Sequence, residues 1–480
     1  MRLSKLFKNA PTTNVTGLCF DSRKVKPGDV YFCLPGLTYD GHDFIDDALD
    51  KGAVCIVYSR DLKEKRPGAI YVRVQDVNAA MNQCARLFYQ KPSDKMRMFG
   101  ITGTNGKSSV ANIIRAIMNT QEPTGYIGTI GIDYGDQHLM PDLTTPDALF
   151  LQRTLNDMVS AGMKDCALEV SSHGLAQGRV DAIHFDAAVF TNFTYDHLDF
   201  HGTMENYFDA KSKLFKEQVK ADGVCILNMD DPRYKDLERL SKARVVSYGI
   251  DSEADYRAID IQMTSTSSHF NLVHQGRLYP VMTNLVARYN IYNLLAAIAA
   301  LHETGMPFDR ILPACENLPQ IKGRLEQIDA GQDFHVIVDF AHTPDGMEQM
   351  FQFGRSITGE NGDVIAVFGS AGKRDVAKRK VFGELADKYC DLIILTEDDP
   401  RDENPREIAA QIREGIKNTN NLYIEDRYEA INQAISSAKK DDVVLILGKA
   451  DEPFIYRENG RSPYIGDNVA AKECIEALRK

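Results

Sequence analysis

Short apolar runs recur along the 480-residue chain, and most of them end in a polar loop. Between the runs, apolar positions return at helical spacing. Val110, Ile113, Ile114 and Ile117 fall at i, i+3, i+4 and i+7, which places them on one face of a helix. Strands that alternate with such helices form mostly parallel sheets, so the pattern predicts the α/β class. The predicted strands are 30–34, 53–57, 98–101, 166–170, 187–193, 336–340, 364–368, 392–395 and 443–447.

The pattern divides the chain into three predicted domains, within the range of about two to four that this length allows. Residues 1–93 form a small N-terminal α/β domain, and 94–325 a central domain with a P-loop ATPase-like, mostly parallel sheet. Residues 326–480 form a C-terminal, Rossmann-like doubly wound sheet. The polar run Lys91–Lys95 contains Pro92 and predicts a linker between the first two domains.

A glycine-rich loop follows the first predicted strand of the central domain and precedes its first helix. It contains Gly103, Gly106, Lys107 and Ser108, spaced one residue tighter than in the common Gly-x-x-x-x-Gly-Lys-Ser/Thr phosphate loop. Glycines let backbone N–H groups turn toward phosphate oxygens at a helix N-terminus, and the lysine reaches the β and γ phosphates. The alternative is a tight strand–helix turn with a surface lysine. Because strand, loop and helix agree, the sequence predicts a phosphate site.

Polar side chains also follow other strands of the central domain. Glu169 lies inside an apolar strand, where a carboxylate is costly unless it is paired or binds a cation. His197 follows the next strand, and the carboxyl ends of parallel strands share one edge of a sheet. Each alone is commonly structural. Together with Ser108 they predict a hard-cation site of oxygen ligands and one imidazole.

The four predicted C-terminal strands each end in a loop that carries arginine or acidic residues. Such a mixture suits a zwitterion, because a guanidinium binds a carboxylate and acids bind an ammonium group. Surface salt bridges are the alternative. Two N-terminal loops, at Ser22 and at 35–42, are further ligand candidates, with ordinary turn chemistry as the alternative.

Composition adds three expectations. With 68 acidic and 56 basic residues, the net charge of −12 argues against general nucleic-acid binding. The nine cysteines include no C-x-x-C pair, which predicts free thiols and a reducing cytoplasm. No stretch approaches the roughly 20 apolar residues of a membrane span, and no signal peptide is expected.

Taken together, the motifs resemble the Mur ligase family, and within it the E-type enzymes. The motifs that carry the resemblance are Thr102–Ser108, Glu169–His173, Asp196–Asp199, Asn290-x-x-Asn293, Gly323-Arg324 and Asp339–Pro344, in the family's order. The resemblance covers essentially the whole chain in three domains. The nucleotide loop alone is shared with folylpolyglutamate synthetases.

The resemblance implies a ligase that forms a carbon–nitrogen bond in peptidoglycan synthesis, in the cytoplasm and as a monomer. ATP phosphorylates the free carboxylate of UDP-N-acetylmuramoyl-L-alanyl-D-glutamate. The amine of a diamino acid then attacks the acyl phosphate, and ADP and phosphate are released. Mg²⁺ is the expected cofactor.

The resemblance also implies residue roles. Catalytic roles fall to Lys107, Lys211, His197 and Glu169. ATP is held by Thr102, Gly103, Thr104, Asn105, Gly106, Lys107, Ser108, Asn290, Asn293, Arg324 and Asp339. The UDP-muramoyl-dipeptide is held by Ser22, Asp40, Gly41, His42, Thr144, Thr145, Ser171, Gln177 and Arg179. Mg²⁺ is served by Ser108, Glu169, His197 and Lys211, the last as a carbamate formed with CO₂. The amino-acid substrate meets Arg374, Asp398, Asp399, Arg401, Asp451 and Glu452.

Three stretches of the chain depart from the diaminopimelate-adding enzymes. Asp399 stands where they carry Asn, 448–452 reads Gly-Lys-Ala-Asp-Glu instead of Gly-Lys-Gly-His-Glu, and Leu143 stands where Asn is common. An extra acid repels a distal carboxylate and attracts a lysine ammonium. We therefore expect L-lysine in preference to meso-2,6-diaminopimelate, although Arg401 remains as in diaminopimelate enzymes.

Two other hypotheses remain. A folylpolyglutamate synthetase shares the loop, but those enzymes start near it and lack a domain such as 1–93. A non-catalytic nucleotide switch would need neither Lys211 nor a second sheet lined with arginine and acids.

Overall fold

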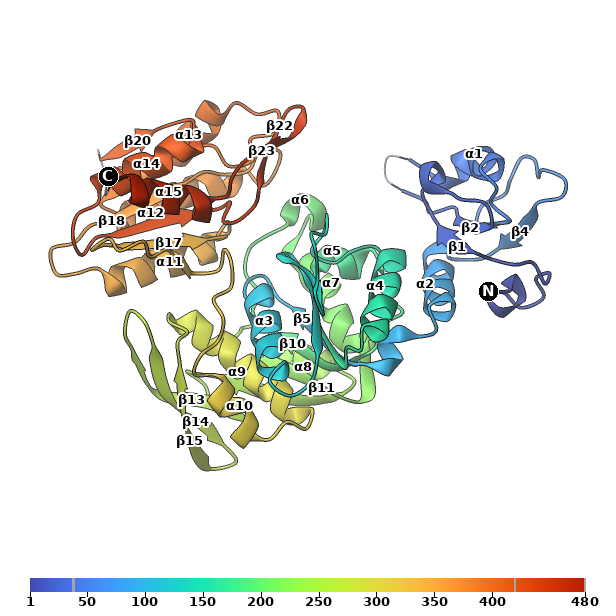
Figure 1. Ribbon diagram of the computed structural model, residues 1–480, viewed down its shortest axis with the longest axis horizontal. Coiled ribbons are helices and arrows are strands. Elements are labelled where there is room, and N and C mark those ends of the chain that lie inside the picture. The colour runs from blue at the N-terminus through green and yellow to red at the C-terminus, as the bar shows by residue number, and fades with distance from the viewer. Residues whose placement is uncertain (37–38, 418–419, 479–480) are drawn as a thin grey trace.

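The computed structural model describes residues 1–36, 39–417 and 420–478, so Leu37 and Thr38 of the predicted 35–42 loop lie outside the described residues. It has the predicted α/β fold, with one large sheet inside each predicted segment. Figure 1 shows the central sheet between the N-terminal body and the C-terminal body, with the N-terminal one attached through the region of α2. The exact domain boundaries remain predictions.

The N-terminal sheet has four parallel strands in the order β1-β2-β3-β4. Apolar clusters cover both of its faces, because its central strands are buried on both sides. Residues Pro92–Lys95 of the predicted linker form a 3₁₀ turn, and Arg86 pairs with Asp94 there at 2.7 Å. The elements are η1 (Leu3–Lys5), β1 (Gly17–Cys19), η2 (Ser22–Lys24), β2 (Asp29–Phe32), η3 (Gly41–Phe44), α1 (Ile45–Asp50), β3 (Cys55–Tyr58), β4 (Ile70–Arg73), α2 (Val77–Phe88) and η4 (Pro92–Lys95).

The central sheet has eleven strands in the order β15-β14-β13-β12-β11-β10-β5-β9-β6-β7-β8. Strand β5 lies between β10 and β9, so the strand order reverses beside it, and ligands of open α/β sheets bind at such a point. The strands are β5 (Arg97–Thr102), β6 (Thr124–Gly128), β7 (Gly131–Tyr134), β8 (Gln137–Leu139), β9 (Asp165–Glu169), β10 (Phe185–Phe190), β11 (Val219–Asn228), β12 (Arg244–Gly249), β13 (Tyr256–Met263), β14 (Ser268–His274) and β15 (Arg277–Thr283). The helices are α3 (Lys107–Met118), α4 (Ala148–Ser160), α5 (Ser172–Ala176), α6 (Leu198–His201), α7 (Met204–Glu217), α8 (Tyr234–Leu240), α9 (Arg288–Glu303) and α10 (Phe308–Ala314).

Both ends of this sheet are antiparallel extensions that the sequence analysis did not predict: β6-β7-β8 and β13-β14-β15. Strand β8 is wholly exposed, and the edge strand β15 contains Pro280. An edge strand buries at most one face, so neither β8 nor β15 carries the continuous apolar run by which the other strands were predicted.

The C-terminal sheet has the order β16-β17-β21-β18-β19-β20, and all pairs except β16-β17 are parallel. Apolar clusters pack on its two faces. Because β17, β18, β19 and β21 are parallel, their polar loops meet at one edge, as predicted. The elements are β16 (Glu326–Gln327), β17 (His335–Asp339), α11 (Pro344–Ile357), β18 (Val364–Phe368), α12 (Ala377–Tyr389), β19 (Leu392–Leu395), α13 (Pro405–Arg413), β20 (Asn421–Tyr423), α14 (Arg427–Ser437), β21 (Val443–Leu447), α15 (Asp467–Leu478) and a hairpin, β22 (Phe454–Arg457) with β23 (Gly460–Pro463).

Within the described residues, no helix is long and apolar enough to cross a membrane. All nine cysteines are buried as free thiols, in line with the composition.

Candidate active site

The phosphate loop joins β5 to α3, as the sequence predicts. Its backbone is fixed by the neighbouring strand β10, since the Thr191 hydroxyl donates to the carbonyl oxygen of Asn105 at 2.6 Å. The Lys107 ammonium folds over the loop and donates to the carbonyl oxygens of Gly103 and Thr104, at 3.1 and 2.9 Å. Burial lowers the pKa of Lys107, partly opposed by the carboxylates of the site. A lysine held this way is placed to meet a phosphate at the mouth of the loop.

Gly106 explains why this loop needs glycine. Its φ of 86° lies in the left-handed region, and a Cβ there would come within 2.5 Å of the Asn293 side-chain oxygen. Asn293 in turn donates to the Asn290 side-chain oxygen at 3.0 Å. The Asn293 amide therefore lies against the phosphate loop, and Asn290 supports it from one turn earlier on α9.

Lys211 is almost completely buried on α7 and donates to the carbonyl oxygen of Gly103 at 2.7 Å. Burial lowers its pKa well below the usual value, and the nearby Lys107 adds to the effect. Its ammonium nitrogen also lies 4.5 Å from the ring centre of Tyr207. The structure thus brings Lys211 to the phosphate loop, as a lysine that loses its proton readily.

Glu169, at the end of β9, is fully buried, and three donors hold its carboxylate. The Tyr126 hydroxyl donates to one oxygen at 2.5 Å, and the Thr129 backbone N–H reaches the same oxygen at 3.0 Å. The Thr129 hydroxyl donates to the other oxygen at 3.2 Å. The sequence analysis missed Tyr126 and Thr129, because nothing in the sequence shows that β6 pairs with β9.

His197 has a positive φ of 54° just before α6. Its Nε2 atom lies 3.2 Å from an oxygen of Asp196. Burial nevertheless lowers the pKa of His197 to about 3. A neutral imidazole, the Glu169 carboxylate and the buried Ser108 hydroxyl are donor types that suit a hard cation with one nitrogen ligand.

The residues predicted to hold the muramoyl-dipeptide come together after β9. The Thr145 hydroxyl donates to the Glu169 carbonyl oxygen at 2.8 Å and accepts from the Ser171 N–H at 2.9 Å. The Arg179 guanidinium donates to the Thr145 carbonyl oxygen at 2.7 Å and also to the Gln177 side-chain oxygen. Thr144 joins the same group, because its hydroxyl lies 3.0 Å from that of Thr129, a residue that also contacts Glu169.

The predicted uridine-binding residues lie on the N-terminal sheet. The buried His42 donates from Nδ1 to Asp40 at 2.6 Å, while its Nε2 accepts from the Ser59 N–H at 3.1 Å. Ser22 is buried at the start of η2. Tyr31 donates to the Gly41 carbonyl oxygen at 3.0 Å. Both nitrogens of His42 are thus engaged within the protein.

Two further predicted ATP residues lie on either side of the boundary between the central and C-terminal segments. The Arg324 guanidinium reaches the Ser108 hydroxyl at 3.3 Å and stacks on Phe340. Asp339 accepts from the backbone N–H groups of Leu325 and Ala341 at 2.7 and 2.8 Å, and burial raises its pKa. The boundary between the central and C-terminal segments therefore contacts the phosphate loop through Arg324.

The acidic residues predicted for the amino-acid substrate surround a lysine. The fully buried Lys449 ammonium donates to Asp399 at 2.9 Å and forms an ion pair with Glu452. Asp399 also accepts from the Tyr456 N–H at 2.9 Å. Asp398 is buried at the same edge, and burial raises its pKa, as it raises that of Glu452 to about 7. For Glu452, burial and the neighbouring acids outweigh the attraction of the lysine.

The two candidate arginines differ. Arg374 forms an ion pair with Asp199 of the central segment at 3.1 Å. Arg401 donates to the Gly372 carbonyl oxygen at 3.0 Å and has no carboxylate partner among the described residues. Asp451 follows Lys449 in the loop after β21. Arg401 is therefore the guanidinium left for a ligand.

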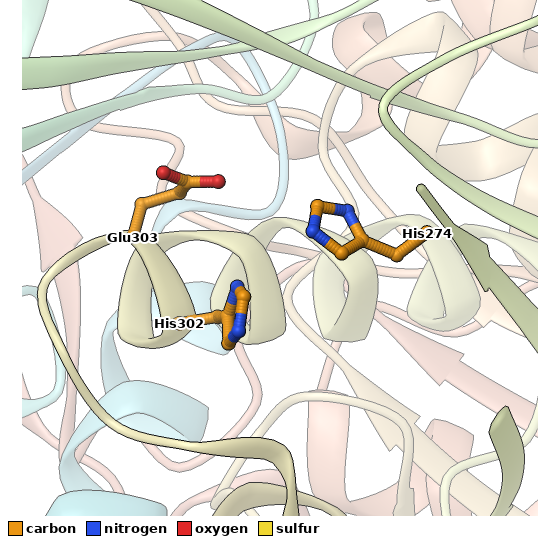
Figure 2. A group of neighbouring side chains, drawn as sticks. All are labelled: His274, His302 and Glu303. Carbon is orange, nitrogen blue, oxygen red and sulfur yellow. The ribbon is translucent and has the colours of Figure 1, made fainter. Parts of the chain in front are cut away.

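A second cluster lies at the far end of α9. Figure 2 shows His302 and Glu303 on this helix and His274 on β14, with ligand atoms within 4.8 Å of one another. Such a trio resembles a zinc ligand set. The Tyr256 hydroxyl, however, lies 2.5 Å from His302 Nδ1 and 2.6 Å from a Glu303 oxygen. His302 and Glu303 thus already have hydrogen-bond partners within the protein, and these bonds connect β13 to α9.

The fold and site define a P-loop nucleotide-binding protein whose phosphate loop faces the polar edge of a second α/β sheet. Family models match residues 14–89 (Mur ligase family, catalytic domain), 101–301 (Mur ligase middle domain) and 323–450 (Mur ligase, glutamate ligase domain). The chain belongs to the Mur ligase family and is a ligase that forms carbon–nitrogen bonds.

Individual proteins that are similar to this chain indicate which type of Mur ligase it resembles. The UDP-N-acetylmuramoyl-L-alanyl-D-glutamate–2,6-diaminopimelate ligase of Caldanaerobacter subterraneus subsp. tengcongensis is 42% identical, over 93% of this chain and 92% of that protein. The ligase of the same name from Halalkalibacterium halodurans is 39% identical, over 96% and 95%. A solved structure of a ligase of this name has a TM-score of 0.72 at 29% identity and covers 100% of this chain and 99% of its own. These relatives favour diaminopimelate, the sequence-based alternative, over L-lysine.

Proposed function

We propose that this chain joins an amine of meso-2,6-diaminopimelate to the free carboxylate of UDP-N-acetylmuramoyl-L-alanyl-D-glutamate, with ATP and Mg²⁺. A carboxylate does not react with an amine, so phosphorylation by ATP first supplies a leaving group. The amine then attacks the acyl phosphate, an amide bond forms, and phosphate leaves. This extends the relatives' named reaction to this chain.

The observation that carries the choice of diamino acid is Arg401. Its guanidinium makes no ion pair with any described residue, and it lies at the edge that also holds Asp398 and Asp399. The distal end of diaminopimelate carries an ammonium and a carboxylate, whereas that of lysine carries only an ammonium. An uncommitted guanidinium beside acids therefore suits the zwitterionic end.

Asp399 does not count against this choice. The expectation of L-lysine treated its charge as free, but Lys449 neutralises it at 2.9 Å inside the protein. Acids at this edge also bind the ammonium that both diamino acids share, so they do little to distinguish lysine from diaminopimelate. Removing Arg401, the cation proposed to bind the distal carboxylate, should change the preference between the two substrates most.

The remaining residues take up roles around the acyl phosphate. Lys107 would contact the phosphates. Ser108, Glu169, His197 and a carbamate on Lys211 would hold Mg²⁺, which neutralises charge on the phosphoryl group. Tyr126 and Thr129 would keep the Glu169 carboxylate in place. A phosphate loop that is covered by the C-terminal segment also excludes water from the acyl phosphate.

The test is a product-mass assay with ATP, Mg²⁺, the UDP-dipeptide and each of meso-diaminopimelate, L-lysine and L-ornithine. The expected result is a tripeptide product with diaminopimelate at the highest kcat/KM. Arg401→Ala should lower kcat/KM for diaminopimelate by about 100-fold, since a charged hydrogen bond contributes about 1.5–3 kcal/mol, and should change that for lysine much less. Asp399→Asn is the matched control and should keep the order of substrates. A higher kcat/KM for lysine in the wild-type protein would overturn the proposal.

A further inference from the structure

We propose that Asp345 is a positioning residue that couples the C-terminal sheet to the phosphate loop through the side chain of Asn105. The inference rests on the proposed role of this loop in binding ATP. Asp345 lies in the first turn of α11, and Asn105 lies in the middle of the loop.

The contact spans two segments that are 240 residues apart. The Asn105 side-chain amide donates to a carboxylate oxygen of Asp345 at 2.9 Å. The hydroxyl of Thr343, the N-cap of α11, reaches the Asn105 side-chain oxygen at 3.4 Å. Both ends of the Asn105 amide are thus held by the first turn of a helix in the C-terminal segment.

The backbone of Asn105 is held from the opposite side. Its N–H donates to the Asn192 side-chain oxygen at 2.9 Å, and its carbonyl oxygen accepts from the Thr191 hydroxyl. Both partners follow or end strand β10 of the central sheet. Asn105 is therefore the point where the central sheet, the phosphate loop and the C-terminal segment meet.

This geometry matters because the next two residues are Gly106 and Lys107. Phosphate binding by a loop depends on where its N–H groups point, and a misplacement of about 1 Å costs up to about 100-fold in rate. Gly106 has a φ of 86°, so the loop at this point has few side-chain restraints of its own. A side chain anchored to α11 supplies such a restraint only while the C-terminal segment is in place.

Two ion pairs between the two segments do not have this property. Arg374 pairs with Asp199, and Arg461 reaches Asp142 at 3.2 Å with both side chains largely exposed. Neither contact touches the phosphate loop. Exposed pairs of this kind contribute little.

A purely structural role for Asp345 is also conceivable. An acid in the first turn of α11 interacts favourably with the helix dipole, through its charge. Positioning through Asn105 needs only a hydrogen-bond acceptor. Asp345→Asn distinguishes the helix-dipole role from the positioning role, because it removes the charge and keeps an oxygen that can accept from the Asn105 amide.

The experiment is a double-mutant cycle of Asn105→Ala and Asp345→Ala in the full chain, with KM for ATP, kcat and thermal midpoint measured for each variant. Each single variant should raise KM for ATP by about tenfold, as expected for a lost hydrogen bond to a charged group, and the double variant should be no worse than either. Asp345→Asn should recover most of the loss. Glu384→Ala, an exposed acid on α12, is the matched control.

Additive effects of the two substitutions would overturn the coupling. Equal damage from Asp345→Asn and Asp345→Ala would overturn the positioning role and leave a helix-charge role. Failure of the proposed ATP site itself is distinguishable, because Lys107→Ala would then leave ATP binding unchanged.

Discussion

At the residue scale, burial sets the protonation state of the side chains around the phosphate loop. Lys107 and Lys211 both donate to the carbonyl oxygen of Gly103, so two ammonium groups compete within a few ångströms. Burial lowers both pKa values, and the charge of Lys107 lowers that of Lys211 further. A lysine that is neutral for part of the time is nucleophilic and reacts with CO₂. This supports the proposal that Lys211 becomes a carbamate.

Lys211→Ala should lower kcat by at least about 100-fold, in line with the loss of a group that organises a metal site. The rate of phosphate release in the presence of the UDP-dipeptide and diaminopimelate measures kcat. Short carboxylic acids should restore part of the rate, and stripping CO₂ should slow only the wild-type protein. Lys213→Ala, on the same helix, is the control. A fully active Lys211→Ala variant would contradict the carbamate.

The low pKa of His197 predicts a pH dependence of stability. The folded protein keeps this imidazole neutral down to about pH 3, whereas the unfolded chain takes up a proton below about pH 6.5. The unfolded state thus binds more protons between these values, and stability falls as the pH falls through them. Urea unfolding at pH 7 and at pH 5 should show that the free energy of unfolding falls less for His197→Asn than for the wild-type protein. Equal losses would show that His197 is not the group involved.

At the element scale, α9 joins two different polar clusters. Its first turns carry Asn290 and Asn293, next to the phosphate loop. Its last turn carries His302 and Glu303, which bond to the Tyr256 hydroxyl on β13. The helix between them is almost completely buried. The antiparallel extension β13-β14-β15 is therefore fastened to the same helix that borders the nucleotide site.

Tyr256→Phe should lower the free energy of unfolding by about 1–3 kcal/mol, because it removes the hydrogen bonds to the half-buried His302 and Glu303. Urea unfolding at neutral pH measures this. Tyr134→Phe is the matched control, since its hydroxyl has no hydrogen bond among the described residues. An unchanged free energy of unfolding would mean that water replaces the hydroxyl.

At the scale of the whole molecule, the proposed site is divided between two sheets. Arg324 and Asp345 reach the phosphate loop from this side, whereas the ion pairs Arg374–Asp199 and Arg461–Asp142 across the boundary are partly exposed. Exposed pairs hold surfaces together weakly. We therefore expect the two sheets to change their relative position when substrates bridge them.

Small-angle scattering should record a smaller radius of gyration when an ATP analogue and the UDP-dipeptide are added together. Either ligand alone should have less effect, because each contacts fewer of the three segments. The Asp345→Ala variant should need more ATP analogue for the same change. A profile that does not respond to both ligands would count against closure.

Much of the secondary structure follows from the local sequence. The nine predicted strands are present, although their ends shift by up to a few residues, and the phosphate loop joins β5 to α3 as expected. Apolar runs and glycine positions report burial and backbone conformation at the residue itself, so they can be read along the chain. The two antiparallel extensions and the hairpin β22–β23 were missed, because half-exposed edge strands leave a weak pattern.

Which charges remain free was decided only by the tertiary structure. Asp399 is neutralised by Lys449, 50 residues further along, and Arg374 by Asp199, 175 residues earlier. Arg401 keeps an uncommitted guanidinium among the described residues. The sequence placed these acids and arginines at one edge of the C-terminal sheet but did not show how they pair. The reason is physical: the energy of a charge depends on its neighbours within a few ångströms, and folding chooses those neighbours from anywhere in the chain.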